Sequence, residues 1–68
     1  MLTFKSTYIQ NASDEEVLAH FDNEIIPAVA GMNIMINDIW YEITEVALYC
    51  KTLENSYSLS ETIFVKEG

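Results

Sequence analysis

Positively charged residues are the scarcest class in this 68-residue chain. Three lysines stand against eleven aspartates and glutamates, which gives a formal net charge of −8 at pH 7 and a pI near 4.1. Eight uncompensated negative charges repel a phosphate backbone and an anionic lipid surface, so direct binding to nucleic acid or to a membrane is not expected. Any charged partner of this chain is expected to be basic.

Glycine and proline are also rare, with two glycines and one proline, whereas half of the residues are hydrophobic. This composition is too apolar and too poor in breakers for a disordered acidic tail, so residues 1–68 are expected to fold as a single domain. A domain of about 60 residues buries only roughly 60% of its unfolded surface. A homodimer is therefore a plausible supplement to such a small core.

One cysteine, Cys50, excludes an internal disulfide, and a secreted domain of this size usually carries several. The first residues lack the positively charged region and the apolar run of a signal peptide, and no apolar stretch approaches the roughly 20 residues that cross a bilayer. These absences predict a cytoplasmic protein. Cys50 ends an alternating apolar run, which favours a small buried side chain over a nucleophile.

Residues 2–9 mix β-branched and aromatic side chains, which predicts a first strand. The segment that follows has the pattern of a helix start: Ser13 and Glu16 form a capping box, with acidic residues between them in the first turn. The apolar residues that come next lie at helical spacing, namely Val17, Leu18, Phe21 and Ile25. Pro27 ends the predicted helix by residue 26.

A hairpin is predicted after Gly31, where two β-rich runs flank Asn37 and Asp38. Both of these residues tolerate the positive φ that a tight hairpin turn requires. In the second run the apolar side changes over near Thr44 and Glu45, which predicts a bulge.

Residues 53–56 are typical of another turn, and apolar residues alternate from 57 to 65 on a final strand. The resulting order is β-α-β-β-β. It predicts an α+β fold in which one helix packs on a small antiparallel sheet of three to four strands.

Motifs for catalysis or cofactor binding are absent from the sequence. The two glycines do not form a phosphate-binding loop, and on the predicted helix only His20 and Glu24 share a face, too few for a metal site. Glu42 and Glu45 could act as an acid and base pair, but a chain this short seldom leaves a cleft around two carboxylates. The sequence predicts a protein that is not an enzyme and has no cofactor and no metal.

Trp40 and Tyr41 are adjacent on a predicted strand, so their side chains face opposite ways and one of them lies outside the local core. An exposed aromatic side chain on a small protein is typical of an interface, although it can also simply cover the edge of a hairpin.

The acidic residues are the remaining signal, because they occur in every predicted element rather than in a tail. A charge of −8 equals that of about four base pairs, and the −16 of a dimer equals about eight. The same charge also keeps many acidic domains soluble. As candidate partner-binding residues the sequence offers Asp14, Glu15, Glu16, Asp22, Glu24, Asp38, Glu42, Glu45 and Glu61.

In size, acidity, lack of a catalytic motif and mixed helix-sheet order, the chain resembles the small DNA-mimic inhibitors that bacteriophages encode, such as those against the histone-like HU protein. The resemblance implies competition with DNA for the basic groove of a host DNA-binding protein, in the host cytoplasm. A DNA-mimic inhibitor is therefore the leading functional prediction. The alternative is a small interaction or virion assembly adaptor that binds through an apolar patch around Trp40.

Overall fold

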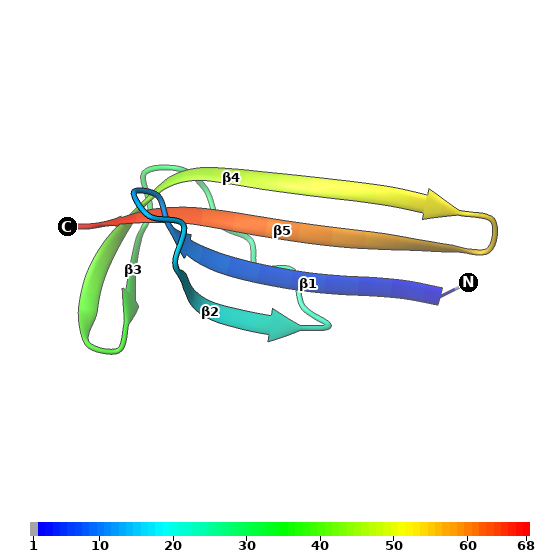
Figure 1. The fold of residues 1–68 in the computed structure, drawn as a ribbon, viewed down its shortest axis with the longest axis horizontal. Coiled ribbons are helices and arrows are strands. Elements are labelled where there is room, and N and C mark those ends of the chain that lie inside the picture. Colours follow the sequence, from blue (N-terminus) through cyan, green and yellow to red (C-terminus); the bar gives the residue numbers. More distant parts are fainter. Residues whose placement is uncertain (1) are drawn as a thin grey trace.

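The computed structural model describes residues 2–68, and these residues form five β-strands in one sheet (Figure 1). The sheet is nearly closed and barrel-like, with the strand order β2-β1-β5-β4-β3. β1 and β5 run parallel, and the other neighbouring strands are antiparallel. The strands are β1 (Leu2–Asn11), β2 (Val17–Asp22), β3 (Asn33–Ile36), β4 (Ile39–Leu53) and β5 (Ser56–Glu67).

The α+β prediction is wrong, because residues 2–68 contain no helix and the segment predicted as helical holds a turn and β2. The predicted capping box is replaced by short-range bonds of the turn. Asn11 Oδ1 accepts from the Ser13 N–H at 3.0 Å and from the Ser13 hydroxyl at 2.8 Å, and the Glu16 N–H donates to Asp14 Oδ1 at 3.0 Å. Short polar side chains that bond nearby backbone in this way compete with helix formation.

Three local predictions are confirmed. Asn37 and Asp38 form the β3–β4 turn with φ values of 52° and 68°. The register of β4 against β5 shifts between Ile43 and Glu45, where a bulge was expected. The β4–β5 hairpin turns between Leu53 and Ser56, and β5 follows as the final strand.

The β3–β4 turn carries strain that glycine would remove. Both central residues adopt positive φ, and glycine is the preferred second residue of such a turn. We expect Asp38→Gly to raise the free energy of unfolding by about 0.5–1 kcal/mol, measured by urea denaturation. Asp38→Asn is the control, since it removes the charge but keeps a side chain with a Cβ atom. Equal stabilisation by both variants would assign the effect to charge and contradict this account.

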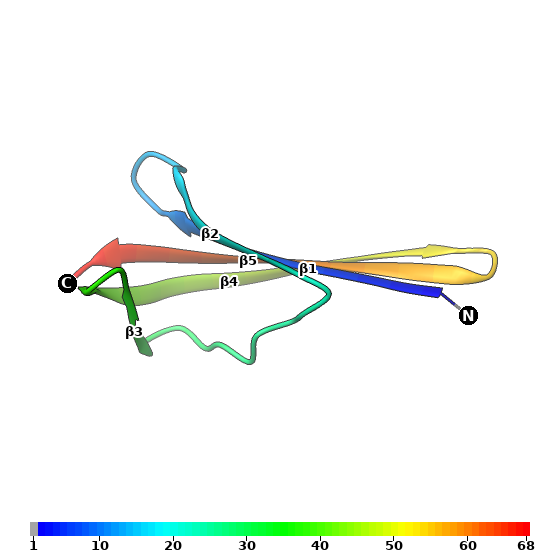
Figure 2. The ribbon, with the colours of Figure 1, turned by 90° about the horizontal axis from the view of Figure 1, so that it is seen from below.

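The core lies on one side of the sheet and consists of the buried side chains Ile9, Tyr41, Ile43, Ile63 and Val65. The connection between β2 and β3, residues 23–32, crosses the sheet over this side (Figure 2). Its Ile26 and Ala28 pack against the core cluster. An extended crossing segment therefore provides the cover that the sequence was expected to provide with a helix.

The sheet extends beyond the part that the crossing segment covers. The molecule measures 42 × 20 × 18 Å, and β4 and β5 continue as a long hairpin with the start of β1 beside it (Figure 1). We call residues 3–5 and 47–60 the arm. Leu48, Tyr49 and Leu53 on its β4 strand are 60%, 66% and 56% exposed. The arm is thus a sheet without a core of its own.

Candidate functional site: an acidic end

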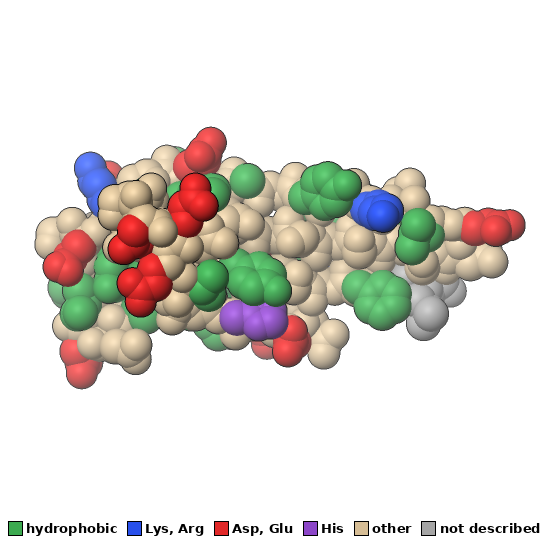
Figure 3. Space-filling view, in the orientation of Figure 1, with side chains coloured by type: hydrophobic (Ala, Val, Ile, Leu, Met, Phe, Trp, Pro, Cys, Tyr) green, Lys and Arg blue, Asp and Glu red, His purple; other side chains and the backbone are tan. Residues whose placement is uncertain are grey.

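The charged side chains are distributed unevenly over the fold. Red acidic side chains gather toward the end of the molecule that carries the C-terminus, on the face shown in Figure 3. We call this region the acidic end; it comprises the β1–β2 and β3–β4 turns and the adjoining parts of β4 and β5. Its charged residues are Asp14, Glu15, Glu16, Asp38, Glu42, Glu45, Lys66 and Glu67. Seven carboxylates and one lysine give 1 − 7 = −6.

The arm has the opposite balance. Lys5 and Lys51 outnumber Glu54 there, so its net charge is 2 − 1 = +1. The three remaining carboxylates, Asp22, Glu24 and Glu61, complete the total of −6 + 1 − 3 = −8. Most of the net charge of the protein is thus carried by one end of an elongated molecule.

The β1–β2 turn is fastened to the acidic end by backbone hydrogen bonds. The Ala12 N–H donates to the Val65 carbonyl oxygen and the Asn11 N–H to that of Glu16, both at 2.8 Å. Glu15 adopts a φ of 59°, and its N–H donates to the Asn11 carbonyl oxygen at 2.8 Å. The side chains of residues 14–16 are all exposed, so the turn presents three successive carboxylates to solvent.

A single ion pair neutralises part of this surface. Lys66 Nζ lies 3.5 Å from Glu42 Oε1 on the neighbouring strand, and both side chains are substantially exposed. Such a surface pair contributes only about 0–1 kcal/mol to stability. The other six carboxylates of the acidic end have no ion-pair partner among residues 2–68.

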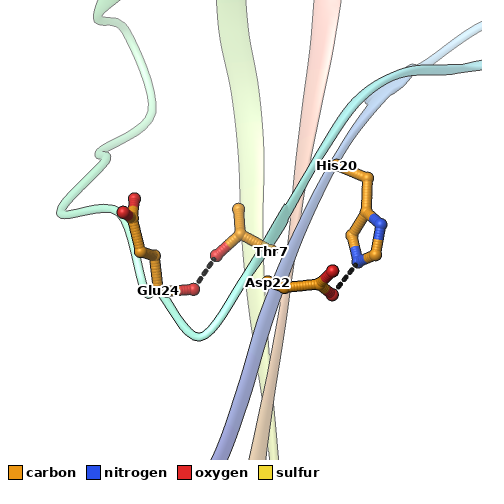
Figure 4. A network of polar contacts seen from close by, with 4 residues as sticks. All are labelled: Thr7, His20, Asp22 and Glu24. Atoms are coloured by element: carbon orange, nitrogen blue, oxygen red, sulfur yellow. Dashed lines mark hydrogen bonds and ion pairs between the residues drawn. The ribbon is translucent and has the colours of Figure 1, made fainter.

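Asp22, another predicted partner-binding residue, lies outside the acidic end and interacts with a histidine. His20 and Asp22 lie on the same side of β2, and His20 Nε2 is 3.2 Å from Asp22 Oδ1 (Figure 4). The imidazole also stacks on Tyr8 of β1, with ring centroids 4.2 Å apart. His20 was expected to share a helix face with Glu24 instead. In the strand it pairs with the residue two positions away.

Glu61 was predicted as a surface residue, and the structure places it in the interior at 4% exposure. It accepts a hydrogen bond from the Ile26 N–H at 2.8 Å. The Thr7 hydroxyl lies 3.0 Å from the same oxygen, Oε1. It also lies 2.7 Å from the Glu24 carbonyl oxygen (Figure 4). Because the Thr7 hydroxyl has a single proton, it donates to only one of these two acceptors at a time. Glu61 therefore anchors the crossing segment and does not belong to a surface site.

The exposed apolar side chains include one that the sequence indicated, Trp40, and a group on the arm that it did not. Trp40 is 56% exposed and Tyr41 is buried, as expected of neighbours on a strand. Cys50, predicted to be buried, is exposed because it lies on the uncovered arm. The exposed apolar side chains of the arm are Phe4, Leu48, Tyr49 and Leu53.

Within residues 2–68 there is no pocket, and no three side chains of His, Cys, Asp or Glu are grouped to hold a metal ion. The described part of the chain also has no helix that could cross a bilayer. Comparisons with protein-family models, with curated proteins and with solved structures gave no match.

Proposed function

We propose that this protein is a non-enzymatic inhibitor that occupies the basic DNA-binding surface of a nucleic-acid-binding protein, of which the histone-like HU protein is one type. The observation that supports the proposal is the acidic end, which contains seven carboxylates and only one lysine. A rigid anionic surface of this kind attracts a lysine- and arginine-rich groove and steers association at low salt.

The charge density of the acidic end is comparable with that of a nucleic acid. From Glu45 to the β4–β5 turn the chain covers roughly 27 Å at 3.3 Å per residue, which leaves roughly 15 Å of the 42 Å molecule for the acidic end. A net charge of −6 over that length is one charge per roughly 2–3 Å. B-DNA carries one charge per roughly 1.7 Å as a duplex and one per roughly 3.4 Å along each strand.

Charge reversal on the β1–β2 turn tests the proposal. Glu15→Lys/Glu16→Lys changes the acidic end from −6 to −2, and both side chains are exposed, so the fold should be retained. We expect at least a 100-fold loss of affinity for a histone-like HU protein, measured by competition with labelled duplex DNA at low salt. We also expect the affinity of the unaltered protein to fall steeply with added salt.

A matched control separates the acidic end from net charge alone. Glu24→Lys/Glu54→Lys changes the total charge by the same amount, but both positions lie outside the acidic end. We expect the fold-loss of affinity in this variant to be less than a tenth of the fold-loss in Glu15→Lys/Glu16→Lys. Equal losses in the two double variants would show that only net charge matters. Failure of the unaltered protein to displace DNA from any of a panel of basic DNA-binding proteins would overturn the proposal.

The second candidate is an assembly adaptor that binds through apolar side chains. The exposed Trp40 lies directly across from Met35 on β3, and Met35 is also exposed, so the two form a small apolar patch on the β3–β4 hairpin. Binding through this patch would persist or strengthen at high salt, whereas binding through the acidic end would collapse. The salt dependence of a captured complex therefore decides between the two functions.

A further inference from the structure

The outer edge of β4 is unpaired along the arm. At its beginning β4 pairs with β3, and at Ile43 it bonds to the crossing segment, where the Ile43 N–H donates to Met32 O and the Gly31 N–H donates to Ile43 O. Beyond the bulge, residues 45–53 pair with β5 on one side and with no other described residue on the other. A nine-residue edge is thus open.

The register identifies the backbone groups that this edge exposes. Along a strand, residues alternate between those whose backbone N–H and C=O groups point outward, away from β5, and those whose groups point inward, toward β5. A bulge adds one residue to the inward set. Ile43 directs its backbone groups outward, so after the bulge the outward residues are Val46, Leu48, Cys50 and Thr52. Four N–H and four C=O groups therefore face away from the sheet in a regular row, which is a template for another strand.

The side chains along the edge do not protect it. Natural edge strands are commonly guarded by proline, by several charges or by an inward-pointing lysine. Here residues 45–53 contain no proline and two charged residues, Glu45 at the beginning and Lys51. Leu48, Tyr49 and Cys50 are exposed beside the unpaired backbone. The edge thus combines unpaired backbone groups with apolar side chains.

We propose that this edge pairs with the same edge of a second copy of the chain, antiparallel about a two-fold axis at Tyr49. Residue 49 is the midpoint of the open edge, so this register uses all of residues 45–53 in both copies. A shift of the axis toward Glu45 would drive each β4–β5 turn into the other copy's Gly31 and Met32, which already bond to Ile43. A shift toward Leu53 would leave outward backbone groups of both copies without partners. All eight outward backbone groups of each copy find partners.

Side-chain chemistry agrees with this register. The two Tyr49 rings lie opposite each other, and Leu48 of each copy lies opposite Cys50 of the other. Lys51 lies diagonal to Glu45 of the second copy, a spacing that long side chains bridge. The antiparallel arrangement also places the two acidic ends at opposite ends of the pair, which keeps charges of −6 apart.

Molecular mass and disulfide trapping test the pairing. We expect a mass of 2 × 7.8 = 15.6 kDa by sedimentation equilibrium. In a Cys50→Ser background, Tyr49→Cys places two thiols on facing residues with Cα atoms about 4.5 Å apart, within the roughly 4.4–6.8 Å range of disulfides. Oxidised glutathione, which is reduced as the bond forms, should therefore convert this variant to a covalent dimer.

Ala47→Cys in the same background is the matched control, because two copies of residue 47 are separated by roughly 14 Å in this register. We expect at least ten times less covalent dimer from it. A monomeric mass at the highest attainable concentration, or equal trapping at positions 47 and 49, would overturn the proposal.

A charge on the axis separates this pairing from the proposed inhibition. Tyr49→Asp brings two like charges face to face and should yield a 7.8 kDa monomer that stays folded, since Tyr49 is 66% exposed. Apart from Glu45, the carboxylates of the acidic end lie outside the paired edge in both states, so the monomeric variant should still compete with DNA for a basic protein. A Tyr49→Asp variant that stays dimeric would contradict the pairing, whereas loss of DNA competition by the unaltered dimer would contradict the inhibitor proposal.

Discussion

Replacing Ile63 by alanine is expected to remove most of the stability of the protein. Ile63 is fully buried at the centre of β5, between Ile9 on β1 and Val46 on β4. Truncating a buried isoleucine to alanine costs about 2–5 kcal/mol, because apolar contacts are lost and a cavity remains. At about 0.05–0.15 kcal/mol per residue, 68 residues yield about 3–10 kcal/mol in total. We expect urea denaturation, followed by far-ultraviolet circular dichroism, to show a midpoint close to zero denaturant.

Val29→Ala is the matched control for this experiment. Val29 is 62% exposed on the crossing segment, and we expect its truncation to cost less than about 0.5 kcal/mol. Comparable losses at positions 29 and 63 would mean that the packing is not concentrated on the side of the sheet that contains Ile9, Ile43 and Ile63.

The features predicted correctly from the sequence are those that depend on a few neighbouring residues. Asn37 and Asp38 tolerate positive φ, so their turn could be located without knowing what the hairpin packs against. The change of apolar side near Glu45 likewise reports a local bulge. The pairing of β1 with β5 joins residues more than 50 positions apart, and no local pattern encodes that choice or its parallel direction.

The helix prediction was wrong because the sequence pattern that supported it is compatible with two structures. Ser13, Asp14 and Glu16 are as typical of a polar turn as of a helix start, since their side chains can bond the nearby backbone in either structure. A helix of about a dozen residues has little stability in isolation. The open edge of β1 offers residues 17–22 a ladder of hydrogen bonds that is interrupted once, between Ile9 and Gln10, and this long-range pairing prevails.

The candidate site was predictable in its chemistry but not in its grouping. The excess of carboxylates is evident from the composition, whereas their concentration at one end depends on which turns the sheet brings together. The burial of Glu61 did leave a signal: it occupies the position between Leu59 and Ile63 in the alternating apolar set of β5. Period-two alternation places it on the core side.

Glu61 leads to the second prediction of large effect, which concerns the attachment of the crossing segment. The carboxylate accepts from the Ile26 N–H at 2.8 Å and lies 3.0 Å from the Thr7 hydroxyl. In Glu61→Leu the buried polar groups lose their partner, which costs about 1–3 kcal/mol and more when the lost partner is charged. We expect a loss of about 3 kcal/mol in urea denaturation and faster hydrogen exchange at the Ile26 amide.

Glu61→Gln shows whether the hydrogen bond or the charge fastens this segment. The amide oxygen of glutamine can still accept from the Ile26 N–H, so we expect a loss of no more than about 1 kcal/mol and continued protection of that amide from exchange. Because Ile26 and Ala28 complete the core beside this bond, releasing the segment would uncover the apolar side of the sheet as far as Ile43. A Glu61→Leu variant as stable as the unaltered protein, with the Ile26 amide still protected, would show that apolar packing alone holds the cover in place.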